Sequence, residues 1–128
     1  MKKIRSKPAG ANQRLGQWGE GLAAVYLEER GLRIVERNFR CPLGEIDLIA
    51  QDGDCLVFCE VKTRRSTAFG QPQEAVALAK QRKIIRSATW YIAARQWSTD
   101  VRFDVVAISK PTAGEPVIEW LPAAFFIS

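Results

Sequence analysis

Charged residues interrupt two otherwise apolar segments near the middle of this chain. The first segment reads Gly-Glu-Ile-Asp-Leu-Ile-Ala over residues 44–50, and the second reads Phe-Cys-Glu-Val-Lys-Thr-Arg over residues 58–64. Apolar residues that alternate with polar ones are typical of β-strands, in which every second side chain lies on the same face. Glu45 and Asp47 would therefore share one strand face, and Glu60 and Lys62 would share another.

The loop between these segments predicts how they meet. Residues 51–54 read Gln-Asp-Gly-Asp, which is typical of the tight turn of an antiparallel hairpin. Such a hairpin would place Asp47, Glu60 and Lys62 within reach of one another. Because uncompensated carboxylates in a partly buried site are costly, we expect this cluster to bind a hard divalent cation such as Mg²⁺.

A divalent cation held by carboxylates suits phosphodiester hydrolysis, which needs an activated water and neutralisation of charge on the phosphate. We expect Asp47 and Glu60 to bind the metal directly and the carbonyl of Val61 to add a further oxygen. Either Glu20 or Glu45 would complete the set or hold its bound water.

Lys62 has two interpretations. Near the metal, its ammonium group would orient the attacking hydroxide and stabilise the transition state, whereas a role as general base would need a depressed pKa. In the alternative, Glu60 and Lys62 form an ion pair on a solvated strand face, with Asp47 as a cross-strand partner. That alternative explains less well why charges interrupt two apolar runs.

The surrounding sequence predicts the elements that would position these residues. We expect a helix over residues 12–30, strands over residues 32–40, 45–50 and 55–64, a helix over residues 72–96, and strands over residues 101–108 and 117–121. Because a long helix follows the third strand, the fourth strand is expected to pair with it in parallel. The element order αβββαββ predicts an α/β fold.

Both helices are predicted to pack on the sheet through apolar residues. The expected core faces are Leu15, Trp18, Leu22, Val25 and Tyr26 on the first helix, and Leu78, Ile84, Ile85, Ala88 and Ile92 on the second. Glu20 lies on another stripe of the first helix, with Ala23 and Leu27, so both an inward-facing and a solvated carboxylate stay open. The four tryptophans are interpreted as packing residues rather than as platforms for stacked bases.

The composition predicts one domain with a basic extension. A chain of 128 residues with 47% hydrophobic content can form one core, which we place at residues 12–128. Residues 1–11 are interpreted as a flexible arm that attaches to a polyanion such as DNA or RNA, the alternative being a solubilising tail. The chain has a net charge of +5, and its positive charges before the first acid are Lys2, Lys3, Arg5, Lys7 and Arg14. Further candidates for nucleic-acid binding are Arg37, Arg40, Arg64, Arg65, Arg82, Lys83 and Arg86.

Absent residue types exclude several kinds of protein. The chain has no histidine, which excludes Ser-His-Asp hydrolases, His-based ribonucleases and most zinc hydrolases. Its three cysteines follow no metal-binding spacing, so they are expected to be reduced thiols. There is no apolar run of membrane-spanning length and no signal-peptide pattern, which predicts a cytoplasmic protein without a membrane partner.

A series of motifs carries a likeness to a known family. In chain order they are Gly19-Glu20, Arg-Asn-Phe-Arg at residues 37–40, the two charged segments described above, and Arg-Phe-Asp-Val-Val at residues 102–106. With these motifs the chain resembles the YraN family of bacterial proteins over about residues 12–110. That family is similar to the PD-(D/E)xK nuclease superfamily and particularly to archaeal Holliday-junction resolvases.

The resemblance implies a fold and a set of site residues. The fold would have the restriction-endonuclease-like αβββαβ core, a mixed central sheet flanked by helices. Glu20 would be the acid of the first helix, Asp47 the motif aspartate, and Glu60 and Lys62 the E-x-K pair. Ile46 stands where many members of the superfamily have proline.

From the residues and the resemblance together we hypothesise an endonuclease that uses Mg²⁺ or Mn²⁺ and acts on DNA rather than RNA, with branched or structured DNA as one candidate. Glu45 has no fixed counterpart in the superfamily, while Gln73 and Lys80 on the second helix are expected to approach the site. One rival is a nucleic-acid-binding module of the same fold without catalysis, and another is a structural protein whose acids form salt bridges. A homodimer would be natural if four-way junctions are the substrate.

Overall fold

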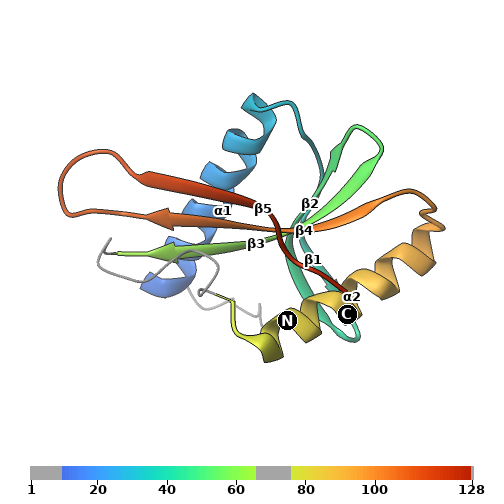
Figure 1. The fold of residues 1–128 in the computed structure, drawn as a ribbon. Helices are drawn as coiled ribbons and strands as arrows, with labels where there is room; N and C mark the ends of the chain where they lie inside the picture. Colours follow the sequence, from blue (N-terminus) through green and yellow to red (C-terminus); the bar gives the residue numbers. More distant parts are fainter. Residues whose placement is uncertain (1–9, 66–75, 128) are drawn as a thin grey trace, which may run out of the picture.

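The computed structural model describes residues 10–65 and 76–127. Its elements, in chain order, are α1 (Ala11–Glu29), β1 (Arg33–Cys41), β2 (Gly44–Asp52), β3 (Cys55–Arg64), α2 (Leu78–Arg95), β4 (Val101–Ser109) and β5 (Val117–Phe125) (Figure 1). This is the αβββαββ order expected from the sequence. The tight turn between β2 and β3 is also present, with Gly53 at a φ of 59° that glycine adopts readily.

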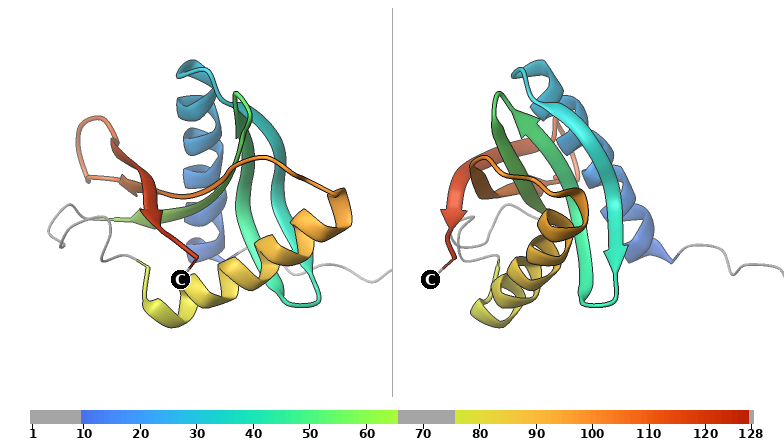
Figure 2. Two further views of the ribbon diagram at one scale, coloured as in Figure 1. Left: turned by 45° about the vertical axis from the view of Figure 1, so that its right-hand side comes forward. Right: turned by 90° about the vertical axis from the view of Figure 1, so that its right-hand side faces the viewer.

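The strands form one five-stranded sheet in the order β1-β2-β3-β4-β5. The first three strands pair in antiparallel fashion, β4 pairs parallel to β3, and β5 pairs antiparallel to β4. The mixed sheet predicted from the sequence is therefore confirmed. Because β4 must run parallel to β3, the chain returns through the crossover helix α2, and Figure 2 shows α1 and α2 on opposite faces of the sheet.

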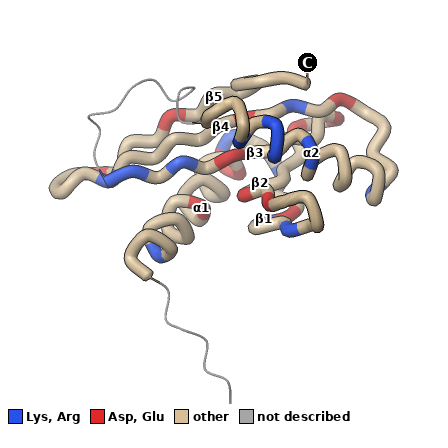
Figure 3. The backbone as a smooth tube through the Cα atoms, turned by 90° about the horizontal axis from the view of Figure 1, so that it is seen from below, with Lys and Arg blue, Asp and Glu red and all other residues tan. Residues whose placement is uncertain are grey.

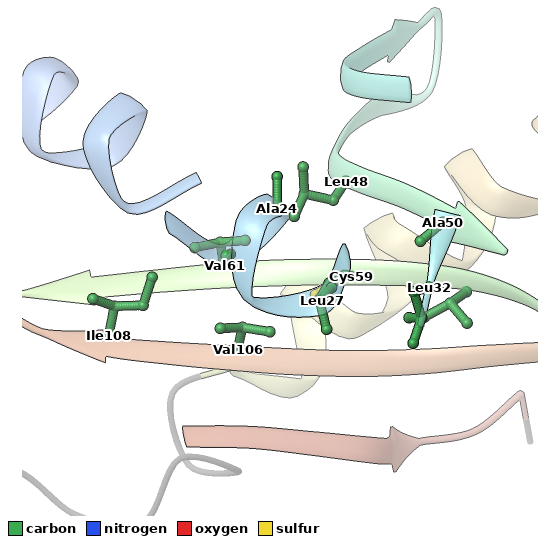
Figure 4. Packing of buried hydrophobic residues seen from close by; sticks show 11 residues of the cluster. Ala24, Leu27, Leu32, Leu48, Ala50, Cys59, Val61, Val106 and Ile108 are labelled. Atoms are coloured by element: carbon green, nitrogen blue, oxygen red, sulfur yellow. The ribbon is translucent and has the colours of Figure 1, made fainter. Parts of the chain in front are cut away.

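α1 packs on the sheet through its small residues. The buried positions of this helix are Gly19, Ala23, Ala24 and Leu27, and the last three belong to one core cluster with Leu48, Cys59, Val61 and Val106 (Figure 4). The predicted core face was wrong in one position, since Val25 is 52% exposed. The buried stripe is the one that contains Ala23 and Leu27, because small side chains let the helix axis come close to the strands. Glu20 lies on that stripe.

α2 covers the opposite face with Ile84, Ala88 and Tyr91, which pack on Phe58 in a second core cluster. The predicted helix start at residue 72 was wrong, because Val76 and Ala77 precede the helix in non-helical conformations. Leu78, predicted as a core residue, is 60% exposed because it opens the first turn. Trp18, Trp97 and Trp120 pack against the two clusters as expected, whereas Trp90 is 39% exposed.

The hairpin of β1 and β2 bends away from β3 at Asp47, as the diverging strands in Figure 1 show. β2 pairs with β3 from Leu48 to Asp52, and the preceding residues of β2 pair only with β1. In a regular strand, Ile46 and Leu48 would lie on the same face because they are two residues apart. Here Ile46 packs in the core cluster under α2 and Leu48 in the core cluster under α1, so the strand changes face between them. Across from this switch, Asn38 on β1 has a left-handed φ of 53°, which asparagine tolerates better than most residues.

At the far end of the sheet, Asp104 ties β5 to β4. It is fully buried and accepts hydrogen bonds from the Arg102 guanidinium at 2.9 and 3.0 Å. It also accepts one from the Trp120 indole and one from the backbone N–H of Ala123, each at 2.9 Å. The carboxylate therefore has a complete set of structural partners, which accounts for the Arg-Phe-Asp motif without a catalytic role.

Two further sequence predictions concern thiols and membranes. Cys41, Cys55 and Cys59 are all free, as expected. In the parts of the chain that the structure describes, neither helix has the length and apolarity needed to cross a bilayer.

Candidate functional site

Asp47 lies where β2 leaves β3, and its side chain takes over a backbone hydrogen bond there. The Asp47 Oδ2 atom accepts a hydrogen bond of 2.8 Å from the backbone N–H of Val61. If β2 continued to pair with β3 here, a backbone carbonyl of β2 would accept this hydrogen bond instead. Because the N–H and C=O of one strand residue point to the same side, the Val61 carbonyl is directed toward the same gap between the strands.

Glu60 is buried beside Asp47 and is only 6% exposed. The two carboxyl groups are hydrogen-bonded to each other. Burial, followed by the charge of Asp47, raises the pKa of Glu60 to about 7, and burial also raises the pKa of Asp47. The pair therefore disfavours two full negative charges near neutral pH.

Two lysines face this carboxyl pair. The Nζ atom of Lys80 on α2 lies 4.0 Å from Glu60 Oε1. Lys62 is half-buried on β3, where strand alternation places it on the same face as Glu60. The positive charges of Lys80 and Lys62 both lower the pKa of Glu60, although burial outweighs them. The expected approach of Lys80 to the site is thus present, while Gln73 lies outside the described residues.

α1 supplies a third carboxylate, that of Glu20. Burial, followed by the charge of Asp47, raises the pKa of Glu20 to about 6, and the neighbouring Arg37 opposes this rise. With its amide nitrogen directed at Glu20, as its hydrogen-bonding partners require, Asn38 donates to both carboxylate oxygens at 2.8 Å each. Of the two open interpretations of Glu20, the structure favours the inward-facing one.

The close approach of α1 to β3 depends on Gly19. A methyl group added at Gly19 would overlap the hydroxyl of Thr63 and lie 3.0 Å from its Cβ. Only glycine lets the helix backbone come this near to the strand. Since Glu20 is the next residue, this contact fixes how far its carboxylate stands from the gap between β2 and β3.

Glu45 stands farther out. Its side chain is exposed and lies 3.9 Å from the guanidinium of Arg40. Its negative charge nevertheless raises the pKa of both Glu20 and Asp47, which shows that it borders the same cluster. Figure 3 looks onto this end of the sheet, with acidic positions of the strands between the two helices.

The donor set decides which ion would fit. Among the described residues, no three aspartate, glutamate, cysteine or histidine side chains converge closely enough to hold a metal ion by themselves. Mg²⁺ is commonly held by one or two carboxylates and keeps several waters. Asp47 and Glu60 supply that number beside the Val61 carbonyl, and the charge of Asp47 acts on Glu20 at the border of the same cluster. The residues therefore fit Mg²⁺ or Mn²⁺ in a partly hydrated state.

The predicted nucleic-acid-binding residues lie on several elements. Arg37 and Arg40 are on β1, and Arg64 is the last residue of β3 and is directly followed by Arg65. Blue positions continue from the acidic ones along β3 in Figure 3. Arg82, Lys83 and Arg86 are exposed on α2. The arm residues Lys2, Lys3, Arg5 and Lys7 lie outside the described residues.

Sequence reasoning missed Asn38 as a residue of the site. It appeared only within a motif, although a signal was available, because asparagine is disfavoured in strand interiors and tolerates left-handed conformations. A strand with asparagine at its centre predicts a local irregularity, and here that irregularity faces the acidic cluster.

Comparison with known proteins identifies relatives across most of the chain. The profile of the uncharacterised protein family UPF0102 matches residues 19–108. A UPF0102 protein of Syntrophotalea carbinolica is 48% identical over 112 residues, which cover 87% of this chain and 90% of that protein. One from Geotalea daltonii is 47% identical over 95% of this chain and 97% of its own length. Another, from Rhodococcus jostii, is 52% identical over 89% of this chain and 98% of its own.

Proposed function

The chain belongs to the uncharacterised protein family UPF0102, and from that premise we propose that it is a Mg²⁺- or Mn²⁺-dependent endonuclease that acts on DNA. Branched or otherwise structured DNA is the substrate class we favour. The observation that carries the proposal is the carboxyl pair of Asp47 and Glu60. Asp47 accepts the Val61 N–H at 2.8 Å where β2 leaves β3, and the buried Glu60 lies 4.0 Å from the Lys80 ammonium.

That observation supports metal binding for an energetic reason. A carboxyl group whose pKa is raised to about 7 is held in an environment that disfavours its charge. A divalent cation bound by the two carboxyl groups would favour their charged forms, so binding would relieve the penalty. Asp47 and Glu60 would hold the ion, with the Val61 carbonyl as a further oxygen.

Each side chain then has a task in phosphodiester hydrolysis. When bound, the ion supplies a Lewis acid for the phosphate and lowers the pKa of a bound water. Glu20, which accepts hydrogen bonds from Asn38, would orient a water molecule by accepting a hydrogen bond from it. Lys62 and Lys80 contribute positive charge on the side of Glu60, where charge on the phosphate oxygens increases in the transition state.

One observation favours a second candidate, a nucleic-acid-binding module without catalysis. The described residues lack a group of three metal-ligating side chains, which a tightly held ion would have. Such a module would use the same basic residues and would need no ion.

A cleavage assay with matched variants separates the two candidates. Labelled duplex, single-stranded, flap and four-way-junction DNA, and RNA, would be incubated with Mg²⁺ or Mn²⁺. We expect wild-type protein to cut one structured DNA, and Asp47→Asn or Lys62→Gln to slow cutting at least about 100-fold. Asp54→Asn, an exposed acid of the β2–β3 turn, serves as the control and should cut normally.

Thermal melting tests the metal site without relying on activity. Saturating Mn²⁺ should stabilise the wild type by about 2.7 kcal/mol at 100 times its dissociation constant, and Asp47→Asn should lose this gain. Binding without cutting, together with no response to metal, would support the non-catalytic module instead.

A further inference from the structure

A second candidate site lies at the N-terminal end of α1, beyond the acidic cluster. The structure has a cavity of about 370 Å³ lined by Ala11, Arg14, Leu15, Trp18, Arg65 and Lys110. Three of these six residues are cationic and none is acidic. We call this feature, with Arg14, Arg65 and Lys110 around Trp18, the basic cavity.

Three elements build the basic cavity, so its charges are held together by the fold. Arg14 and Trp18 stand four residues apart and therefore share one face of α1. Arg65 and Lys110 directly follow the paired ends of β3 and β4, where the Lys110 N–H donates to the Arg64 carbonyl at 2.7 Å. The Lys110 ammonium lies 5.1 Å from the centre of the Trp18 ring. Trp18 therefore helps to hold Lys110 over the cavity through a cation–π contact.

The electrostatics of the basic cavity favour an anion. The first turn of α1 contains no acidic residue, so the positive end of the helix adds to the three side-chain charges. Guanidinium groups bind phosphate oxygens in a planar, two-point geometry, and lysine adds a point charge. A hydrophobic ligand would be a poor match for such a lining.

We propose that the basic cavity binds the phosphate backbone of the nucleic-acid chain to one side of the cleaved bond, an inference that rests on the proposed function. Along β3, Arg64 is four residues from Glu60, which corresponds to about 13 Å at roughly 3.3 Å per residue. Phosphates in one strand of a duplex are spaced about 3.4 Å along the axis. For a duplex whose axis lies along β3, the cavity would therefore meet a phosphate about four base pairs from the acidic cluster.

Binding measured with a charge-matched pair of variants tests this proposal. The cavity variant is Arg65→Gln with Lys110→Gln, and the control is Arg30→Gln with Arg33→Gln, two exposed cations at the other end of α1. Fluorescence anisotropy of a labelled 20-nucleotide DNA, in EDTA, would give the dissociation constant from 50 to 300 mM KCl. Melting curves would verify that both variants fold.

We expect the cavity variant to bind about tenfold more weakly and to lower the slope of log affinity against log salt by about 1.4 to 1.8, since each cation that pairs with a phosphate contributes about 0.7 to 0.9. The control should stay within about twofold of wild type in affinity. On a labelled DNA of three nucleotides the cavity variant should still bind more weakly than the control, because so short a chain can occupy the basic cavity alone.

The outcomes separate the two proposals. Equal losses in both variants on the longer DNA would overturn the basic cavity while leaving endonuclease activity standing. Cavity-dependent binding without cleavage in Mg²⁺ or Mn²⁺ would overturn hydrolysis and keep the cavity. If wild type bound no DNA or RNA, both proposals would fall.

Discussion

Glu60 carries two opposing demands at the scale of the single residue. Its burial favours the neutral acid, and metal binding requires the carboxylate. The charge of Asp47 sharpens this conflict, because it repels the charged form of Glu60. In the metal-free protein, the cost of the conflict therefore depends on pH.

This dependence can be measured by urea unfolding in EDTA. The folded-state pKa of Glu60, about 7, exceeds its ordinary value of 4.5. Its contribution to the free energy of unfolding is therefore full below about pH 4.5 and is lost as the pH rises through about 7. We expect the stability of wild type relative to Glu60→Gln to fall between pH 5 and pH 8, by on the order of 2 to 3 kcal/mol.

The chain suits this measurement because it has no histidine, so ordinary histidine titration does not obscure the interval. Glu20, whose pKa is raised to about 6, contributes in the same direction and remains in both proteins of the comparison. Mn²⁺ should reverse the loss at pH 8 in wild type only. A pH-independent difference between wild type and Glu60→Gln would contradict the raised pKa.

Lys80 gives a second prediction at this scale. Its ammonium lies 4.0 Å from Glu60 and neutralises part of the negative charge that a divalent ion would otherwise neutralise. We expect Lys80→Gln to bind Mn²⁺ about fivefold more tightly, because removing a like charge a few ångströms away is worth about 1 kcal/mol in a partly solvated site. Calorimetric titration measures this, and Lys83→Gln, an exposed lysine on the same helix, is the control. Weaker binding by Lys80→Gln would contradict the inference.

At the scale of the element, the site depends on how close α1 comes to β3. Gly19 contacts Thr63 with no room for a side chain, whereas a methyl group at Gly16 would meet nothing within 4 Å. These two of the three glycines in α1 therefore differ in purpose. Gly16 lowers the stability of the helix and makes no close contact that requires glycine. Gly19 permits the contact that positions Glu20.

Substituting each glycine with alanine tests this distinction. Gly19→Ala should lower the free energy of unfolding by about 1 to 3 kcal/mol through overpacking, and Gly16→Ala should raise it by up to about 1 kcal/mol. Adding Thr63→Ala to Gly19→Ala should recover part of the loss, because the overlapping hydroxyl is removed. Chemical denaturation of the wild type and of the three variants measures these differences. A Gly19→Ala protein as stable as Gly16→Ala would show that the helix position is not set by this contact.

At the scale of the whole molecule, sequence patterns predicted most of the fold because they report local periodicity. Alternation in β2 and β3 and the Gly53 turn fixed the hairpin, and the length of α2 required a parallel β4. The face of α1 was less predictable. Its buried stripe uses glycine and alanine, whose value lies in close approach to the sheet rather than in hydrophobicity, so an apolar count favoured Val25 instead.

The candidate site was predictable in its acids and less so in its geometry. Asp47 and Glu60 stood out because charges interrupted apolar strands, and their proximity followed from the hairpin. The bend at Asp47 could not be predicted from the hairpin pattern. It accompanies the left-handed conformation of Asn38 on the neighbouring strand and the change of sheet face between Ile46 and Leu48. Such long-range irregularities leave no periodic trace in one chain.

The charge of the whole molecule leads to a final prediction. Removing residues 2–9 takes away Lys2, Lys3, Arg5 and Lys7, and with them four of the 19 lysines and arginines. If these residues contact phosphates, the truncated protein should lose up to about 3 units in the slope of log affinity against log salt, at roughly 0.7 to 0.9 per contact. Anisotropy titrations on duplex DNA measure this slope.

A Gly/Ser arm of equal length is the control, because it keeps the chain and removes only the charge. Cutting at low salt should persist in both proteins, since the acids and lysines proposed for hydrolysis belong to the folded domain. Combining the arm deletion with Arg65→Gln and Lys110→Gln should give a loss near the sum of the two, because the arm and the basic cavity would contact different phosphates. An unchanged slope after deletion would favour the solubilising tail over the DNA-binding arm and would leave the basic cavity as the main phosphate contact outside the acidic cluster.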